Sequence, residues 1–172
     1  MNAIVSPNCR IRYPESFVVG DHSIVDDFGY FSTKIRIGIG CHVAAGCTIA
    51  GGRDRQFTLG DFSGIAAGVR IYCTSNDYVR DLVTIAPDAS IETNAVSGDV
   101  TFGAYTGIGA NSVVLPNNSI PEGTVIGALS FVPANFKFQP WAVYVGNPVK
   151  YIMPRNKDSV LAQAERFRAR HK

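Results

Sequence analysis

A large apolar residue recurs every six positions along most of this chain. Stepping by six from Val19, from Leu59 and from Phe102 meets an apolar side chain at all fifteen positions reached before the pattern breaks. Because 46% of the chain is hydrophobic, chance agreement is on the order of one in 10⁵ for a fixed register. The fifteen positions are Val19, Val25, Phe31, Ile37, Val43, Ile49, Leu59, Ile65, Ile71, Phe102, Ile108, Val114, Ile120, Ile126 and Val132.

A period of six matches neither the helical period of 3.6 nor the strand period of 2. It matches a chain that turns a corner after each short strand, so that three hexads close one turn of a prism. Residues 18 apart then stack, as Val19 does on Ile37. The pattern predicts an all-β, left-handed parallel β-helix, whose stacked turns share a core that one turn could not bury. Five turns can be counted, at 19–36, 37–58, 59–76, 102–119 and 120–137.

Two breaks in the period predict segments outside the prism. The step from Ile49 to Leu59 is ten, so four extra residues bulge from a corner. The step from Ile71 to Phe102 is 31, which predicts a protruding loop of roughly 25 residues at about 73–98. Long loops in a compact domain are usually functional or disordered, so chemistry is expected there.

The period ends at Val132, and the segment that follows is extended and rich in proline. A helix is predicted over 158–170, with Asp158 or Ser159 as its N-cap. Its apolar stripe of Val160, Leu161, Ala164 and Phe167 is expected to cover the open end of the prism. The division predicted is a β-helix domain over 1–150 and a C-terminal tail with the helix over 151–172.

Composition excludes several classes of function. Net charge is +2, from 16 Lys and Arg against 14 Asp and Glu, so no nucleic-acid partner is expected. No apolar run reaches the roughly 20 residues of a membrane span, and no signal peptide is recognised, so a cytoplasmic protein without a transmembrane segment is predicted. The cysteines lack CxxC spacing, which favours buried thiols over a zinc site or disulfides. No metal is expected.

The repeat, together with the segment that follows it, resembles the hexapeptide-repeat acyltransferases of the galactoside, maltose, xenobiotic and polysaccharide acetyltransferase kind. The resemblance covers about Val19 to Arg155. Its most specific stretch is FGAYTGIGANSVVLPNNSIPEGTVIGALSFV, followed by the Gly-Asn-Pro segment WAVYVGNPVKYI. The resemblance implies a homotrimer with acyl-CoA sites between neighbouring prisms, using acetyl-CoA or another acyl-CoA as co-substrate.

The resemblance also implies which residues bind the CoA. Gly109, Ala110, Gly127 and Ala128 are expected to line the pantetheine arm with backbone, although corner geometry alone also explains such residues. Lys150, which follows the Gly-Asn-Pro segment, is expected to approach the CoA phosphates together with Arg155.

The long loop departs from the family pattern at one position. Many relatives place a catalytic histidine there, whereas this chain has Asn76 within the sequence TSNDY. A hydroxyl acceptor profits from a general base more than an amine does, so the missing histidine favours an amine acceptor. Asp77 and Asn76 are the predicted catalytic residues, with Asp77 as a base or as the partner of the acceptor's ammonium group; a turn-forming role is the alternative for Asp77. Ser75 and Tyr78 are predicted to contact the acceptor.

Other bases and other functions stay open. His22 or His42 could supply a base across the trimer interface, although a wall position explains each of them as well. A γ-type carbonic anhydrase would need three convergent histidines, and only these two lie in the repeat. The sequence therefore predicts an acyl-CoA-dependent acyltransferase acting on a sugar or nucleotide-sugar, with an amino sugar favoured, in surface-polysaccharide biosynthesis. The alternatives are O-acetylation of a hydroxyl sugar and a non-catalytic scaffold.

Overall fold

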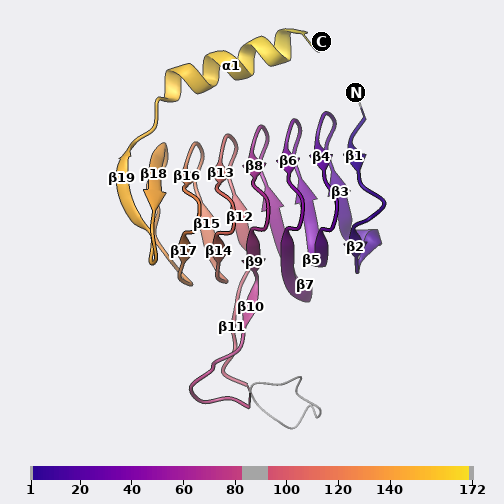
Figure 1. Ribbon diagram of the computed structural model, residues 1–172, viewed down its shortest axis with the longest axis vertical. Helices are drawn as coiled ribbons and strands as arrows, with labels where there is room; N and C mark the ends of the chain where they lie inside the picture. Colours follow the sequence, from indigo (N-terminus) through magenta and orange to yellow (C-terminus); the bar gives the residue numbers. More distant parts are fainter. Residues whose placement is uncertain (1, 83–92, 171–172) are drawn as a thin grey trace.

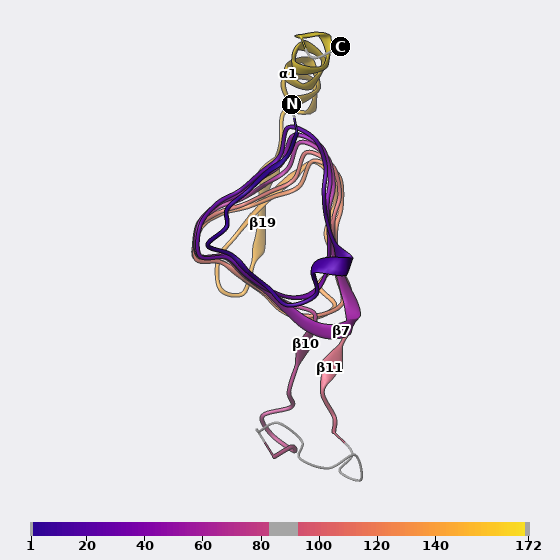
Figure 2. The same ribbon diagram turned by 90° about the vertical axis from the view of Figure 1, so that its right-hand side faces the viewer.

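The chain forms a triangular prism of stacked turns with one helix beside it, as the computed structural model in Figure 1 and the view along the prism in Figure 2 show. The structure describes residues 2–82 and 93–170. The predicted parallel β-helix is confirmed, but it has about seven turns rather than five.

Two sheets make the three walls of the prism. The first wall is an eight-stranded sheet of β1 (Ile4–Val5), β4 (Ile24–Val25), β6 (His42–Val43), β8 (Gly64–Ile65), β13 (Gly107–Ile108), β16 (Val125–Ile126), β18 (Ala142–Val145) and β19 (Lys150–Pro154). The other sheet bends at its long strands, β5 (Tyr30–Ile37) and β7 (Thr48–Leu59), and so makes two walls. The second wall adds β2 (Arg10–Ile11), β9 (Arg70–Tyr72), β14 (Val113–Val114) and β17 (Phe131–Val132). The third wall adds β3 (Phe17–Val19), β12 (Val100–Phe102) and β15 (Asn118–Ile120).

The register between turns matches the predicted spacing of 18. Val19 pairs with Ile37, Val25 with Val43, and the chain around Phe31 with that around Ile49. All fifteen periodic residues except Val19 are buried, and Val19 packs against the core from its edge. Each buried Val, Leu, Ile or Phe contributes roughly 1.5–3 kcal/mol of transfer free energy before conformational entropy is subtracted.

The turns that the periodic pattern did not predict lie at the two ends of the prism. At the start, β1 and β2 pair with β4 and β5, but the 3₁₀ helix Pro14–Ser16 inserts residues and shifts the phase before Val19. At the end, Tyr144 in β18 pairs with Ile126, so the period continues in aromatic residues beyond Val132. The terminal turns were therefore hidden by a phase shift and by a change of residue type.

One corner of the prism, between the third and first walls, carries left-handed residues stacked turn upon turn. We call it the helix corner, and its members are His22, Gly40, Phe62, Tyr105, Gly123 and Trp141, all with φ between 54° and 71°. The Phe62 and Tyr105 rings stack with centroids 5.8 Å apart, and Tyr105 and Trp141 with centroids 6.0 Å apart. Gly123 leaves room for this, since a Cβ there would lie 2.3 Å from the Trp141 ring.

The helix α1 (Lys157–Arg170) runs along the helix corner, parallel to the prism axis (Figure 1). The Phe167 ring lies edge-on to the Phe62 and His22 rings, at 5.5 and 5.6 Å, and Arg168 donates to the Tyr105 hydroxyl at 2.8 Å. The prediction that α1 covers the open end is therefore wrong, because the aromatic corner offers its apolar stripe a longer surface. The N-cap is also corrected: Asn156 accepts from the Ser159 N–H at 3.0 Å.

Both predicted breaks leave the prism at the corner between the second and third walls, which we call the loop corner. In β7 the register with β5 shifts between Ala50 and Gln56, which is the predicted bulge. Beyond it, β10 (Thr74–Ser75) and β11 (Val96–Ser97) form an antiparallel pair that projects from the prism (Figure 2). The middle of the predicted loop, residues 83–92, lies outside the described residues, as does His171.

Candidate active site

A cavity of about 810 Å³ opens where the loop joins the second wall. The predicted loop residues Ser75, Asn76, Asp77 and Tyr78 all line it. The prism contributes the opposite side, with Tyr72, Leu115, Pro116, Phe131 and Ala134. The structure therefore brings the four predicted loop residues together over an apolar floor, and we call this cavity the loop pocket.

Asp77 is held by the chain that follows it. Its Oδ1 accepts from the backbone N–H of Val79 at 2.9 Å and of Arg80 at 3.2 Å, and the Arg80 guanidinium donates to its Oδ2. These bonds, first that from Val79 and then that from the Arg80 side chain, hold the pKa of Asp77 below its usual range. Asp77 is therefore an ionised carboxylate paired with Arg80, and a weak proton acceptor. The turn-forming role foreseen for it is present at the same time.

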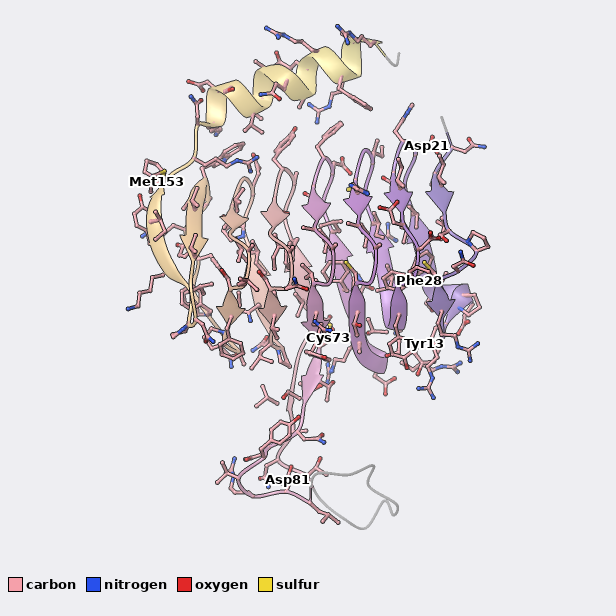
Figure 3. The ribbon with its side chains drawn as sticks, in the orientation of Figure 1. Tyr13, Asp21, Phe28, Cys73, Asp81 and Met153 are labelled. Atoms are coloured by element: carbon pink, nitrogen blue, oxygen red, sulfur yellow. The ribbon has the colours of Figure 1, made fainter. Side chains whose placement is uncertain are left out.

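The base of the loop is fixed to the prism by hydroxyl groups. Thr74 donates from Oγ1 to the Gly51 carbonyl at 3.1 Å and lies 3.0 Å from the Ser97 hydroxyl. Arg55, in the bulge of β7, donates to that same hydroxyl at 2.7 Å. Figure 3 shows Cys73 at the root of the loop, and burial raises the pKa of its thiol to about 11. The two breaks in the period thus support each other.

Farther out, one aspartate joins the two arms of the loop. Asp81, labelled in Figure 3, accepts from both the backbone N–H and the side-chain amide of Asn94, each at 2.7 Å. The two arms of the loop are therefore joined by hydrogen bonds close to residues 83–92, which lie outside the described residues.

A second hollow follows the first wall. It has a volume of about 570 Å³, and His42, Ala44, Ala66, Gly109 and Gly127 are among the residues that line it. We call it the first-wall groove. Its small side chains leave backbone accessible, which suits an extended ligand arm, but small residues also allow the turns to pack.

The predicted CoA-contacting residues divide into two kinds. The N–H groups of Gly109 and Gly127 already donate to Ile126 and Tyr144 at 2.8 Å, and a Cβ on Gly109 would lie 2.3 Å from the next turn. These glycines are therefore required by packing between turns. Within residues 2–82 and 93–170, the N–H groups of Ala110 and Ala128 have no backbone acceptor, so these two residues stay candidates for contact with the CoA arm.

Lys150 and Arg155 lie at opposite ends of β19. Lys150 is exposed and pairs with Val145, near the corner between the first and second walls. Arg155 is half-buried at the helix corner, where it donates to the carbonyls of Tyr105 and Gly123, and burial lowers its pKa. Lys150 stays a candidate for the CoA phosphates, whereas the bonds of Arg155 fix the segment that leads into α1.

The two histidines of the repeat also have distinct surroundings. His22 packs against Phe167 beneath α1. His42 is exposed, lines the first-wall groove and lies 2.8 Å through Nε2 from Asp26 Oδ2. Within the described chain, no group of three His, Cys, Asp or Glu side chains could hold a metal ion.

Comparison with known proteins gives the family. No family model matches the chain. The dTDP-4-amino-4,6-dideoxy-D-glucose acyltransferase of Escherichia coli is 33% identical over 159 residues, which cover 91% of this chain and 81% of the relative. The chain belongs to the hexapeptide-repeat acyltransferases. The predicted acyltransferase class is thereby confirmed.

Solved acyltransferases agree in fold over nearly the whole chain. AntD, an N-acyltransferase from Bacillus cereus solved with dTDP and 3-hydroxybutyryl-CoA, superposes with a TM-score of 0.88 at 28% identity, covering 99% of this chain and 89% of AntD. A variant of AntD in which alanine replaces a serine was solved with dTDP-4-amino-4,6-dideoxyglucose and coenzyme A. It superposes with a TM-score of 0.85 at 28% identity, covering 97% of this chain and 91% of the variant.

Sequence reasoning missed the prism side of the loop pocket. Leu115 and Phe131 line the loop pocket although they lie 40 and 56 residues beyond Ser75. The repeat held a signal for them: both stand beside buried periodic residues, so both had to face outward on the wall from which the loop rises. The ion pair of Asp77 with Arg80, three residues on, was likewise readable from the spacing.

Proposed function

We propose that this protein transfers an acyl group from acyl-CoA to the amino group of a dTDP-linked 4-amino-4,6-dideoxy sugar. The observation that carries the proposal is the loop pocket. There Asp77 is an ionised carboxylate held by hydrogen bonds, and no histidine is among the described residues that line the pocket. The E. coli relative and AntD are named for, or were solved with, such an amino sugar. We further propose a homotrimer that acts in the cytoplasm, in surface-polysaccharide biosynthesis.

The chain's residues would divide the work between binding and proton transfer. In the reaction the amine attacks the thioester carbonyl, an amide C–N bond forms, and the C–S bond breaks to release the free thiol. The Asp77 carboxylate would attract the acceptor's ammonium group, and Ser75, Asn76 and Tyr78 would contact its sugar. Ala110 and Ala128 would donate to a carbonyl of the acyl-CoA, and Lys150 would approach its phosphates.

The proton leaving the amine needs an acceptor other than a strongly held anion. Asp77 fits poorly, because its hydrogen bonds hold its pKa down. His42 is one candidate for this acceptor. It lies 2.8 Å from Asp26 and lines the first-wall groove, so it could reach an acceptor sugar held by the loop of a neighbouring subunit if the protein forms an oligomer. Water is the alternative acceptor, since an ammonium group readily exchanges its proton before attack.

A panel of nucleotide-sugars and acyl-CoA donors, followed by free-thiol release, tests the proposal. We expect turnover with dTDP-4-amino-4,6-dideoxy sugars, and lower kcat/KM with the UDP-linked counterparts. Turnover of free hydroxyl sugars alone would assign O-acetylation instead. Absence of turnover and of any thermal stabilisation by millimolar acyl-CoA would favour a scaffold.

A further inference from the structure

The outward face of the second wall carries one continuous column of side chains. Pairing between successive turns places these residues in a row: Arg10, Tyr30, Thr48, Arg70, Val113 and Phe131. Neighbouring strands lie about 4.8 Å apart, so Arg10 and Arg70 are separated by roughly 14 Å, with Tyr30 and Thr48 between them. The column is cationic toward the N-terminus and apolar toward the loop pocket, which Phe131 lines.

The arginines at the cationic end are available to a ligand. Arg10, Arg12 and Arg70 are exposed, and none of them forms an ion pair with a described acidic residue. Arg12 contacts the Tyr30 hydroxyl, and hydrogen bonds from Ser32 and then Arg12 lower the pKa of Tyr30. Arg70 donates one bond to the Gly68 carbonyl at 3.1 Å, which holds its guanidinium near the corner between the first and second walls.

One more arginine and one aromatic ring border this end, together with an acidic residue. Arg53, from the bulge of β7, lies over the Tyr13 ring at 5.2 Å and 3.4 Å from Glu15. Figure 3 shows Tyr13 among nitrogen-bearing side chains at the N-terminal end of the prism, on the lower edge from which the loop with Asp81 projects. The cationic end of the column therefore lies on the same side of the prism as the loop pocket.

The loop pocket itself is poorly suited to a diphosphate. Its described lining includes the Asp77 carboxylate and no lysine or arginine. A nucleotide-sugar carries two negative charges on its diphosphate, and the guanidinium that contacts Asp77, that of Arg80, is already paired with this carboxylate. Arg70 is the first cation met along the column, two strand spacings or about 10 Å from Phe131.

We propose that Arg10, Arg12 and Arg70, with the Thr48 hydroxyl between them, bind the diphosphate of the nucleotide-sugar acceptor and direct its sugar amine toward Asp77 in the loop pocket. Guanidinium groups bind phosphate oxygens through paired N–H donors, and exposed long side chains can converge over the shorter Thr48. This inference rests on the proposed function and adds where the nucleotide part of the acceptor binds.

Three single variants, Arg10→Gln, Arg12→Gln and Arg70→Gln, test the site by steady-state kinetics on the full-length protein. Each should raise KM for the dTDP-amino sugar by about ten-fold, the effect of one lost charged hydrogen bond, and leave KM for acyl-CoA within two-fold. Arg36→Gln is the matched control, because Arg36 is also an exposed arginine and lies in β5 on the third wall. It should change neither KM.

Thermal shift with dTDP alone gives a second reading that needs no catalysis. The wild-type protein and Arg36→Gln should be stabilised by dTDP, and the three arginine variants clearly less. An unchanged KM for the acceptor in all three variants of an active enzyme would overturn the inference. A rise in KM for acyl-CoA alone would overturn it too, since the arginines would then bind the CoA phosphates. Failure of the proposed function looks different, because the wild-type protein would neither turn over the amino sugar nor be stabilised by dTDP.

Discussion

The two specialised corners of the prism are filled in opposite ways. At the helix corner, Phe62, Tyr105 and Trp141 stack outside the core, and Phe167 of α1 packs edge-on against Phe62. At the loop corner the chain departs from the same repeat and leaves a cavity of about 810 Å³. The same repeat thus carries one corner that is filled by packed aromatic rings and another that holds an open pocket. Changes at the first should cost stability, and changes at the second should cost activity.

The largest expected effect is on stability at the helix corner. Tyr105 is 8% exposed, and its ring lies between those of Phe62 and Trp141. Tyr105→Ala should lower the free energy of unfolding by about 3 kcal/mol, because the truncation leaves unfilled space and removes both ring contacts. Urea denaturation measures this. A loss below about 1 kcal/mol would mean that the aromatic stack adds little to the prism.

The next effect is on activity at the loop corner. Asp77→Asn should lower kcat/KM by about ten- to hundred-fold, since the charged partner of the ammonium group is lost. The pKa of Asp77 lies below its usual range, so the carboxylate is ionised across pH 6 to 9, and the loss should shrink only where the acceptor's ammonium group loses its own proton. Steady-state kinetics at several pH values measure it, with thermal unfolding as the stability control. Removal of an acid limb from the wild-type pH profile would instead identify Asp77 as the base.

A smaller effect is expected where α1 meets the prism. Phe167→Ala removes the edge contacts with Phe62 and His22 and should cost about 1–2 kcal/mol. The acceptor KM should not change, because α1 lies at the other corner. Urea denaturation combined with acceptor kinetics tests both statements. A change in KM without a change in stability would contradict the separation of the two corners.

The smallest effect concerns the root of the loop. Cys73 is buried, and its pKa is raised to about 11, so its thiol should resist alkylation at pH 8, whereas the half-exposed Cys9 reacts first. The raised folded-state pKa contributes stability that is complete below the pKa of the unfolded thiol and is lost as pH rises toward 11. Peptide mapping after brief alkylation measures the order. Rapid labelling of Cys73 would show that the loop corner opens down to the prism.

The repeat made most of the fold predictable, because the six-residue period places residues such as Val25 and Val43 on the inside of successive turns. The errors arose where the period changed phase, at Pro14–Ser16, or changed residue type, at Tyr144. The position of α1 was missed because it depends on aromatic residues at left-handed corners. The 18-residue step from Tyr105 through Gly123 to Trp141 held that signal.

The site was predictable only in part. The break in the period located the loop, and Ser75 and Asp77 do line one pocket. The bonds that Arg155 makes with carbonyls of the helix corner could not be read from its place after the Gly-Asn-Pro segment, since they depend on how β19 folds back antiparallel to β18. Tertiary direction reversals of this kind carry no periodic signal.

The most direct test of the central claim compares two acceptors that differ in one functional group. Initial rates of thiol release from acetyl-CoA would be measured with dTDP-4-amino-4,6-dideoxyglucose and with its counterpart that bears a hydroxyl at the same carbon. We expect rapid release and an amide product with the amine, and background release with the hydroxyl. Equal or faster release with the hydroxyl acceptor would contradict it.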